Sequence, residues 1–122
     1  MSDAGKNPPS KNIEPDFGLC SHLVRLNFPD GDLRPQTVSL EEIRVESAGL
    51  AVETPYPIGL GVALTAEGFA VQATIVDCRS RETDFYVQVR FAEGYRWNAS
   101  DWEPDHFYAP ARKSAKGAAG KR

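Results

Sequence analysis

Cysteines and long apolar runs are scarce in this sequence, and each scarcity limits what the protein can be. Two cysteines in 122 residues are too few for the dense disulfide framework of a small secreted domain. No run approaches the roughly 18 apolar residues that a membrane helix requires. The opening Met-Ser-Asp-Ala-Gly-Lys-Asn-Pro-Pro also lacks the apolar stretch of a secretion signal. We therefore expect a cytoplasmic protein with no segment inserted in a membrane.

Lysine is absent from the middle of the chain, because every lysine lies within residues 1–16 or 111–122. Residues 17–110 carry 7 arginines against 14 acidic residues, a net charge of −7, whereas residues 111–122 carry +5. These shifts in composition predict one compact domain over residues 17–110 between two disordered tails, residues 1–16 and the basic residues 111–122. The basic tail could contact nucleic acid, an acidic partner or an anionic membrane surface, but a solvated segment is favoured.

An acidic domain is a poor surface for nucleic acid. Binding to a phosphate backbone draws most of its affinity from clustered lysine and arginine, and this domain carries twice as many acidic as basic residues. We therefore expect no nucleic-acid partner.

Six segments of the predicted domain alternate between apolar and polar residues, as strands with one buried face do. The clearest pattern places Phe85, Val87, Val89 and Phe91 on one face. A Glu-Gly pair at residues 67–68 predicts a hairpin, and a change of parity at residues 41–42 predicts a β-bulge. The six segments are residues 20–28, 37–46, 49–54, 61–66, 69–78 and 85–91. With no amphipathic helical stretch between them, they predict an all-β fold, a small six-stranded antiparallel β-barrel.

Aromatic residues gather after the last predicted strand. Five of them lie within residues 95–108: Tyr95, Trp97, Trp102, Phe107 and Tyr108. We expect this segment to cap the barrel, or to form a short helix that packs on it. Ser100 and Glu103 have the spacing of a capping box at a helix start, although Pro104 limits any helix to a short one. For this aromatic segment, a role in closing the core is favoured over a role as a binding platform.

The order of these segments resembles the PilZ domain family over residues 20–92. The similarity rests on residues 43–51, a turn containing Pro57, the glycine-led segment Gly-Val-Ala-Leu at 61–64, residues 73–78 and the segment Tyr-Val-Gln-Val-Arg-Phe at 86–91. The resemblance implies a small antiparallel β-barrel, and it implies a bacterial signalling role, because many PilZ domains are receptors for cyclic di-GMP.

Family members that bind this nucleotide carry an Arg-x-x-x-Arg motif and an Asp/Asn-x-Ser-x-x-Gly motif. The first motif is absent here, with Arg25 alone in the first predicted strand. In the second motif, Arg44 replaces the Asp or Asn, Glu46 replaces the Ser, and Gly49 alone is retained. A left-handed turn (positive φ) entering the strand would explain this glycine without any ligand.

The altered motifs lower the affinity that we expect for cyclic di-GMP. Glu46 would repel a dianionic ligand, and the sequence predicts no compensating cluster of basic residues. If the nucleotide binds, the resemblance places Arg25, Arg34 and Arg44 nearest to it, and Arg44 would matter most. We therefore predict a non-enzymatic signalling or adaptor domain that contacts an unidentified protein partner, with weak or absent cyclic di-GMP binding and no resident cofactor.

A second hypothesis uses the sulfur and imidazole side chains. Cys20 and His22 share one strand face, and Cys78 and His106 complete a Cys₂His₂ set that could bind zinc, either to stabilise the domain or for catalysis. The spacing is not that of a standard zinc finger. Because Cys20 and His22 share their face with Val24, Leu26 and Phe28, a core cysteine beside a hydrogen-bonded histidine is favoured over a metal site. No nucleophile lies in a recognised catalytic motif, which favours a non-enzyme.

Overall fold

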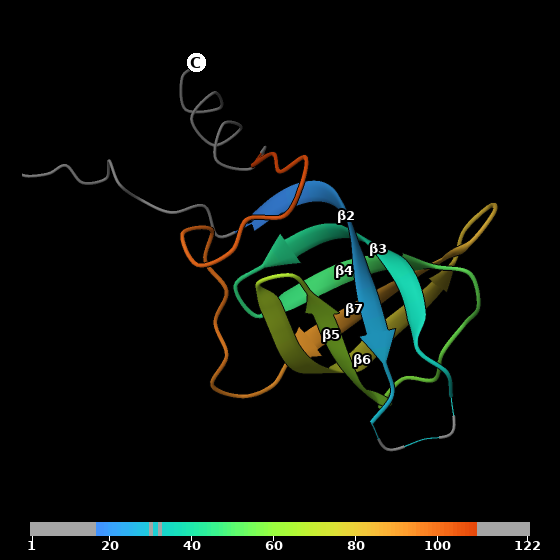
Figure 1. The fold of residues 1–122 in the computed structure, drawn as a ribbon. Helices are drawn as coiled ribbons and strands as arrows, with labels where there is room; N and C mark the ends of the chain where they lie inside the picture. The colour runs from blue at the N-terminus through green and yellow to red at the C-terminus, as the bar shows by residue number, and fades with distance from the viewer. Residues whose placement is uncertain (1–16, 30, 32, 110–122) are drawn as a thin grey trace, which may run out of the picture.

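A closed six-stranded antiparallel β-barrel forms the protein (Figure 1), as the alternating segments predict. The computed structural model describes residues 17–29, 31 and 33–109. The predicted tails, residues 1–16 and 111–122, lie outside the described residues, as does residue 110. The strands are β2 (Phe17–Asn27), β3 (Gln36–Arg44), β4 (Ser47–Val52), β5 (Gly61–Ala66), β6 (Phe69–Ser80) and β7 (Phe85–Phe91).

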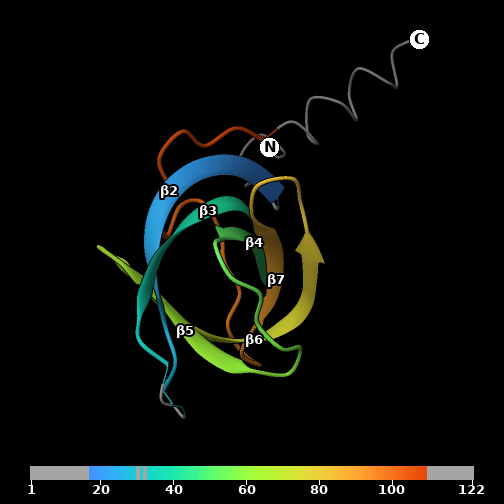
Figure 2. The same ribbon diagram turned by 90° about the vertical axis from the view of Figure 1, so that its right-hand side faces the viewer.

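Neighbouring strands follow the order β2-β3-β4-β7-β6-β5 around the barrel, and β5 returns to β2 (Figure 2). The last contact is short, because only residues 25–27 of β2 pair with residues 63–65 of β5. One end of the barrel holds the β3–β4 turn and the start of β2, and the other holds the loops before β3 and between β6 and β7. We call these the turn end and the loop end.

Apolar side chains from all six strands fill the barrel. The buried set contains no polar or charged residue among those described. Its members are Val24, Leu26, Phe28, Val38, Leu40, Ile43, Ala48, Leu50, Val52, Val62, Leu64, Phe69, Val71, Ala73, Ile75, Val87, Val89, Phe91 and Trp97. Burial of this apolar surface is the main favourable contribution to folding. Because the interior is filled, binding must take place on the outer surface.

The bulge predicted at residues 41–42 is confirmed. The register between β3 and β4 shifts between Leu40 and Glu42, so Leu40 and Ile43 both face the core, with two residues between them. Glu41 and Glu42 consequently both reach the outer surface, where each binds a side chain of another segment. The hairpin at residues 67–68 is also confirmed, with Gly68 at φ +79°.

The aromatic segment after β7 caps the turn end without forming a helix, so the helical alternative is wrong for these residues. Trp97 is almost fully buried, and Trp102 stacks on Phe69 with ring centroids 4.2 Å apart. Asn98 caps a single turn, because its side-chain oxygen accepts hydrogen bonds from the Ser100 and Asp101 amides, and Pro104, which has no N–H, limits the extension of this turn into a helix.

Backbone bonds fasten the end of this segment to β2. Leu19 and Tyr108 exchange two hydrogen bonds, with N–O distances of 2.6 and 2.8 Å. Phe107 lies against Gly18, where a Cβ atom would overlap its ring. We call residues 97–108 the strap. In the part of the chain that the structure describes, no helix is long and apolar enough to cross a membrane.

Candidate functional site

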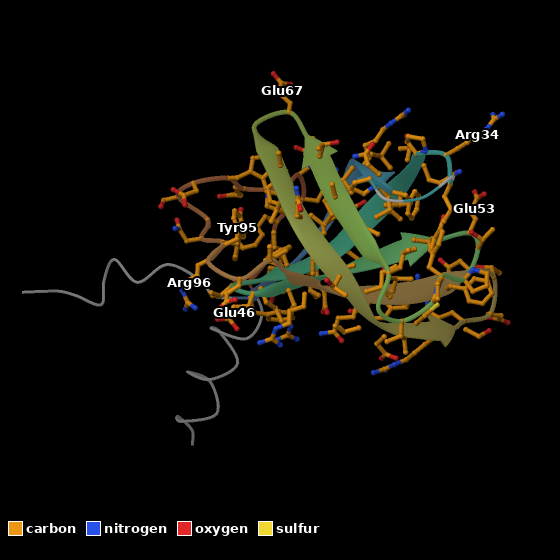
Figure 3. All side chains as sticks on the ribbon, turned by 90° about the horizontal axis from the view of Figure 1, so that it is seen from below. Arg34, Glu46, Glu53, Glu67, Tyr95 and Arg96 are labelled. Carbon is orange, nitrogen blue, oxygen red and sulfur yellow. The ribbon has the colours of Figure 1, made fainter. Side chains whose placement is uncertain are left out.

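Three arginines from separate parts of the chain line one open groove at the turn end. Arg44 ends β3, Arg90 lies on β7 opposite Ser47, and Arg96 follows β7. The groove has a volume of about 490 Å³. We call it the arginine groove; its lining residues are Arg44, Val45, Glu46, Ser47, Val76, Gln88, Arg90 and Arg96. Figure 3 shows Glu46 and Arg96 together at this end of the barrel, beside Tyr95.

Glu46 is the carboxylate on which two of these arginines converge. Arg96 Nη1 lies 2.7 Å from Glu46 Oε2, and Arg90 Nη2 lies 3.5 Å from Oε1. All three side chains are more than half exposed, so each ion pair adds little stability. Most of the guanidinium N–H groups therefore remain available to a ligand.

Arg44 is held by an aromatic ring. Its guanidinium carbon lies 4.1 Å from the centroid of the Phe17 ring, a cation–π contact. Its nearest carboxylate, that of Glu42, is 3.9 Å away. The Arg44 side chain is about half exposed despite this contact, so its guanidinium stays accessible to a ligand.

The backbone around the groove is fixed by the end of β7. The amide of Phe91 donates to the Glu46 carbonyl at 2.8 Å, and the amide of Trp97 donates to the Val45 carbonyl at 2.9 Å. These bonds hold the β3–β4 turn against the segment that carries Arg96, so the buried Trp97 positions the groove.

The prediction that no basic cluster accompanies Glu46 is wrong. Arg90 and Arg96 are 44 and 50 residues from Glu46 in sequence; the pairing of β4 with β7 brings Arg90 close to it, and the bond from the Trp97 amide to the Val45 carbonyl brings Arg96 close. The alternation within residues 85–91 places Arg90 on the outer face, but the order of the strands was needed to find its neighbours.

The three arginines predicted to lie nearest a nucleotide are not brought together. Arg44 lines the groove, whereas Arg34 precedes β3 at the loop end, as Figure 3 also shows. At about 3.3 Å per residue, β3 alone separates them by roughly 25 Å. Arg25 lies on β2 between Thr37 and Thr65, away from the turn end.

Gly49 does not adopt the left-handed conformation that we expected, so that explanation of the glycine is wrong. It lies inside β4, paired with Gln88 and Glu42, and its φ is not positive. The glycine is required by Tyr86, because a Cβ atom at position 49 would lie 2.6 Å from the ring carbon Cζ.

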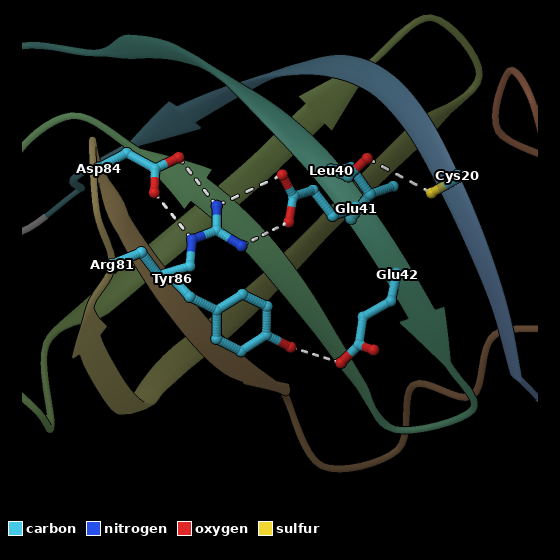
Figure 4. Close-up of polar contacts among 7 residues, drawn as sticks. All are labelled: Cys20, Leu40, Glu41, Glu42, Arg81, Asp84 and Tyr86. Atoms are coloured by element: carbon cyan, nitrogen blue, oxygen red, sulfur yellow. Dashed lines mark hydrogen bonds and ion pairs between the residues drawn. The ribbon is translucent and has the colours of Figure 1, made fainter.

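A second polar network links β3 to β7 and to the loop between β6 and β7 (Figure 4). Arg81 bridges Asp84 and Glu41, with side-chain N–O distances of 2.8 Å and 3.1 Å. Hydrogen bonds from Arg81 lower the pKa of Asp84. The Tyr86 hydroxyl donates to Glu42. Burial is the main cause that raises the pKa of Tyr86, and this hydrogen bond is the second. The polar groups of this network bind one another, and their hydrogen bonds join β3 to β7.

The four candidate zinc ligands make other contacts or lie apart. Cys20 donates to the Leu40 carbonyl (Sγ–O 3.4 Å), and burial, with the nearby charges of Glu41 and Glu42, raises its pKa to about 12. His22 Nδ1 accepts the Asp105 amide at 2.9 Å. In residues 17–29, 31 and 33–109, no group of three or more His, Cys, Asp or Glu side chains could hold a metal ion.

The two remaining members of that set lie on different elements. Cys78 is on β6, opposite Val87, and His106 is an exposed strap residue with φ +58°.

No family model, curated protein or solved structure matches this chain.

Proposed function

We propose that this chain is a non-enzymatic signalling or adaptor domain of the PilZ type, which acts by binding another protein at the arginine groove. The resemblance over residues 20–92 motivates the family, and a six-stranded antiparallel barrel is compatible with it. A fold alone does not specify a function, so the proposal depends on the groove.

The observation that carries the proposal is that Arg44, Arg90 and Arg96 line one groove, in which Arg90 and Arg96 pair with Glu46. Arginine is enriched at protein interfaces because its guanidinium combines a flat apolar face with several donors. The groove is open to solvent and carries charges of both signs, which suits a protein surface better than a small enclosed ligand. Val76, one of the lining residues, is 42% exposed and supplies an apolar contact.

Binding of cyclic di-GMP is the second candidate, and the three arginines favour it. Guanidinium groups bind phosphates and stack on planar bases. Glu46 opposes this function, because its carboxylate lies between the arginines where a phosphate would approach. The protein-binding function is therefore preferred, and a titration with cyclic di-GMP tests the alternative.

Site-specific photocrosslinking in cells tests the preferred function. A photo-activatable amino acid is placed at Val76, which lines the groove, and a control variant carries it at Glu53, which Figure 3 shows at the opposite end. We expect a discrete crosslink to another protein from position 76 and none from position 53. No crosslink at position 76, or equal crosslinks from both positions, would contradict the proposal.

Calorimetric titration with cyclic di-GMP separates the two candidates. We expect no micromolar binding by the wild-type protein. Micromolar binding that disappears in an Arg44→Ala, Arg90→Ala variant would replace the preferred function with nucleotide sensing.

A further inference from the structure

A groove separate from the arginine groove crosses the outer face of β2, β3 and β4 toward the loop end. It has a volume of about 500 Å³ and runs along β3, so we call it the β3 groove. Leu23, Ser39 and Ala51 form one row across it, because Leu23 pairs with Ser39 and Ser39 pairs with Ala51. These three side chains point away from the core, since the residues that flank each of them in sequence include buried ones.

Leu23 stands on the β2 side of the β3 groove and is 68% exposed, the highest fraction among the large apolar side chains that the structure describes as exposed. The other two members of its row, Ser39 and Ala51, are small. A protruding leucine beside a depression lined by small side chains has the shape to fill the same depression on another molecule. Burial of the leucine in this way would remove apolar surface from water.

Two opposite charges flank the β3 groove in the next row. Arg25 pairs with Thr37 on the β2 side, and Glu53 directly follows the end of β4 on the other side. Both side chains are exposed, and neither forms an ion pair with another described residue. Two strand spacings of about 4.8 Å separate them, with β3 in between. The β3 groove therefore has a positive rim along β2 and a negative rim along β4.

The other described charges near the β3 groove keep this polarity. Arg81 binds Glu41 and Asp84, and the three together carry 1 − 2 = −1. They join β3 to β7 beyond β4, on the side of the negative rim. Arg34 lies in the loop before β3, outside the residues that line the groove, and its charge has the same sign as that of Arg25.

We propose that the β3 groove is the contact surface of a twofold dimer of this chain. A twofold axis that runs along β3, between the two molecules, lays β2 of each copy over β4 of the other. Leu23 of each copy then packs over Ala51 of the other, and Arg25 of each copy meets Glu53 of the other. Every contact is made twice, and the opposite rims face each other.

The size of this contact predicts weak association. The β3 groove spans three strands and offers one protruding apolar side chain and one ion pair per copy, which is typical of transient interfaces that bury less than about 1,200 Å² in total. We therefore expect a dissociation constant of about 100 μM. The β3 groove and the arginine groove share no lining residue, so the dimer does not depend on the proposed function.

Sedimentation equilibrium of the full chain, from about 10 μM to about 500 μM, tests the inference. We expect the average mass to rise from one copy toward two. Leu23→Ser should weaken the dimer about tenfold, because the apolar contact is lost twice. Ile58→Ser is the matched control, because Ile58 is 66% exposed and does not line the β3 groove. A monomer at every concentration, or equal effects of the two substitutions, would overturn the proposal.

Charge reversal provides the second part of the test. An Arg25→Glu variant alone places two carboxylates opposite each other at both ion pairs, and a Glu53→Arg variant alone places two guanidinium groups there. Each variant should therefore dimerise about tenfold more weakly than the native chain. A mixture of the two variants restores both ion pairs and should form a mixed dimer, which also shows that both variants are folded. Absence of the mixed dimer would contradict the proposed arrangement.

The two proposals fail separately. A crosslink between copies at position 53 has the mass of two copies of this chain, so it is distinguished from a crosslink to another protein at position 76. If the chain stays monomeric while position 76 captures another protein, this inference is wrong and the proposed function stands. If the dimer forms while position 76 captures nothing, the proposed function is wrong and this inference stands.

Discussion

The Tyr86 ring lies directly over Gly49 and carries its hydroxyl from β7, across β4, to Glu42 on β3. The close approach is tolerated because Gly49 has no Cβ atom. It ties three adjacent strands together through one side chain, and it explains the glycine at this position without any ligand.

We predict that Gly49→Ala destabilises the domain by about 2 kcal/mol, because the added methyl group overlaps the Tyr86 ring and packed strands relax only partly. Urea unfolding followed by tryptophan fluorescence would measure the change. Gly61→Ala is the matched control, since a Cβ atom at that β5 position meets nothing within 4 Å. If Tyr86 is the cause, Gly49→Ala should cost much less in a Tyr86→Ala background, and an undiminished cost would contradict this explanation.

We predict that Phe107→Ala loosens the strap. The Phe107 ring packs on Gly18 and contacts Trp97 at a centroid distance of 5.8 Å, so its removal should cost about 2 kcal/mol for a half-buried aromatic side chain. Amide hydrogen exchange should accelerate at Leu19 and Tyr108, because the amide of each donates to the carbonyl of the other where the strap meets β2.

A surface substitution tests whether the faster exchange is specific to the loss of the Phe107 ring. Ile58→Ala removes a side chain that is 66% exposed and should leave exchange at Leu19 unchanged. If Phe107→Ala also left it unchanged, contacts other than the Phe107 ring would hold the strap.

The outward face of each strand and the bulge at residues 41–42 were predictable because they depend on local alternation. The partners of those faces were not, because they depend on which strands pair. Glu46 and Arg96 are 50 residues apart, and nothing near either residue in sequence indicates the other. The same reason applies to Gly49: we expected a local backbone requirement, and the structure shows contact with a ring from another strand. The strap was predictable as an aromatic cap, but its irregular path depends on contacts with β2.

We predict that the domain loses stability as the pH rises from about 9 to about 12, partly through Cys20. Burial raises the pKa of this thiol from 9.0 to about 12, so the folded chain retains a proton that the unfolded chain releases in this range. The stabilising contribution is complete below pH 9 and disappears as the pH approaches 12. Cys20→Ser keeps the donor to the Leu40 carbonyl but does not titrate in this range.

Unfolding curves of the two proteins between pH 8 and pH 11 isolate the thiol. Tyr86 and Tyr95 also have raised pKa values, but they contribute equally to both proteins. We expect a shallower decline of stability in Cys20→Ser. If the stability of both proteins fell equally with pH, the Cys20 thiol would have the same pKa in the folded and unfolded chains, which would contradict the prediction.

We predict that the purified protein contains far less than one equivalent of zinc, and that a chelator leaves its melting temperature unchanged. Zinc binds cysteine as thiolate, and the raised pKa of Cys20 disfavours that form. His22 Nδ1 is already engaged as an acceptor of the Asp105 amide. Elemental analysis of the native protein and of a Cys78→Ser variant would check this expectation. One equivalent of zinc in the native protein that is lost in the variant would restore the metal site as the better hypothesis, because a Cys78 that makes no metal contact cannot change the zinc content.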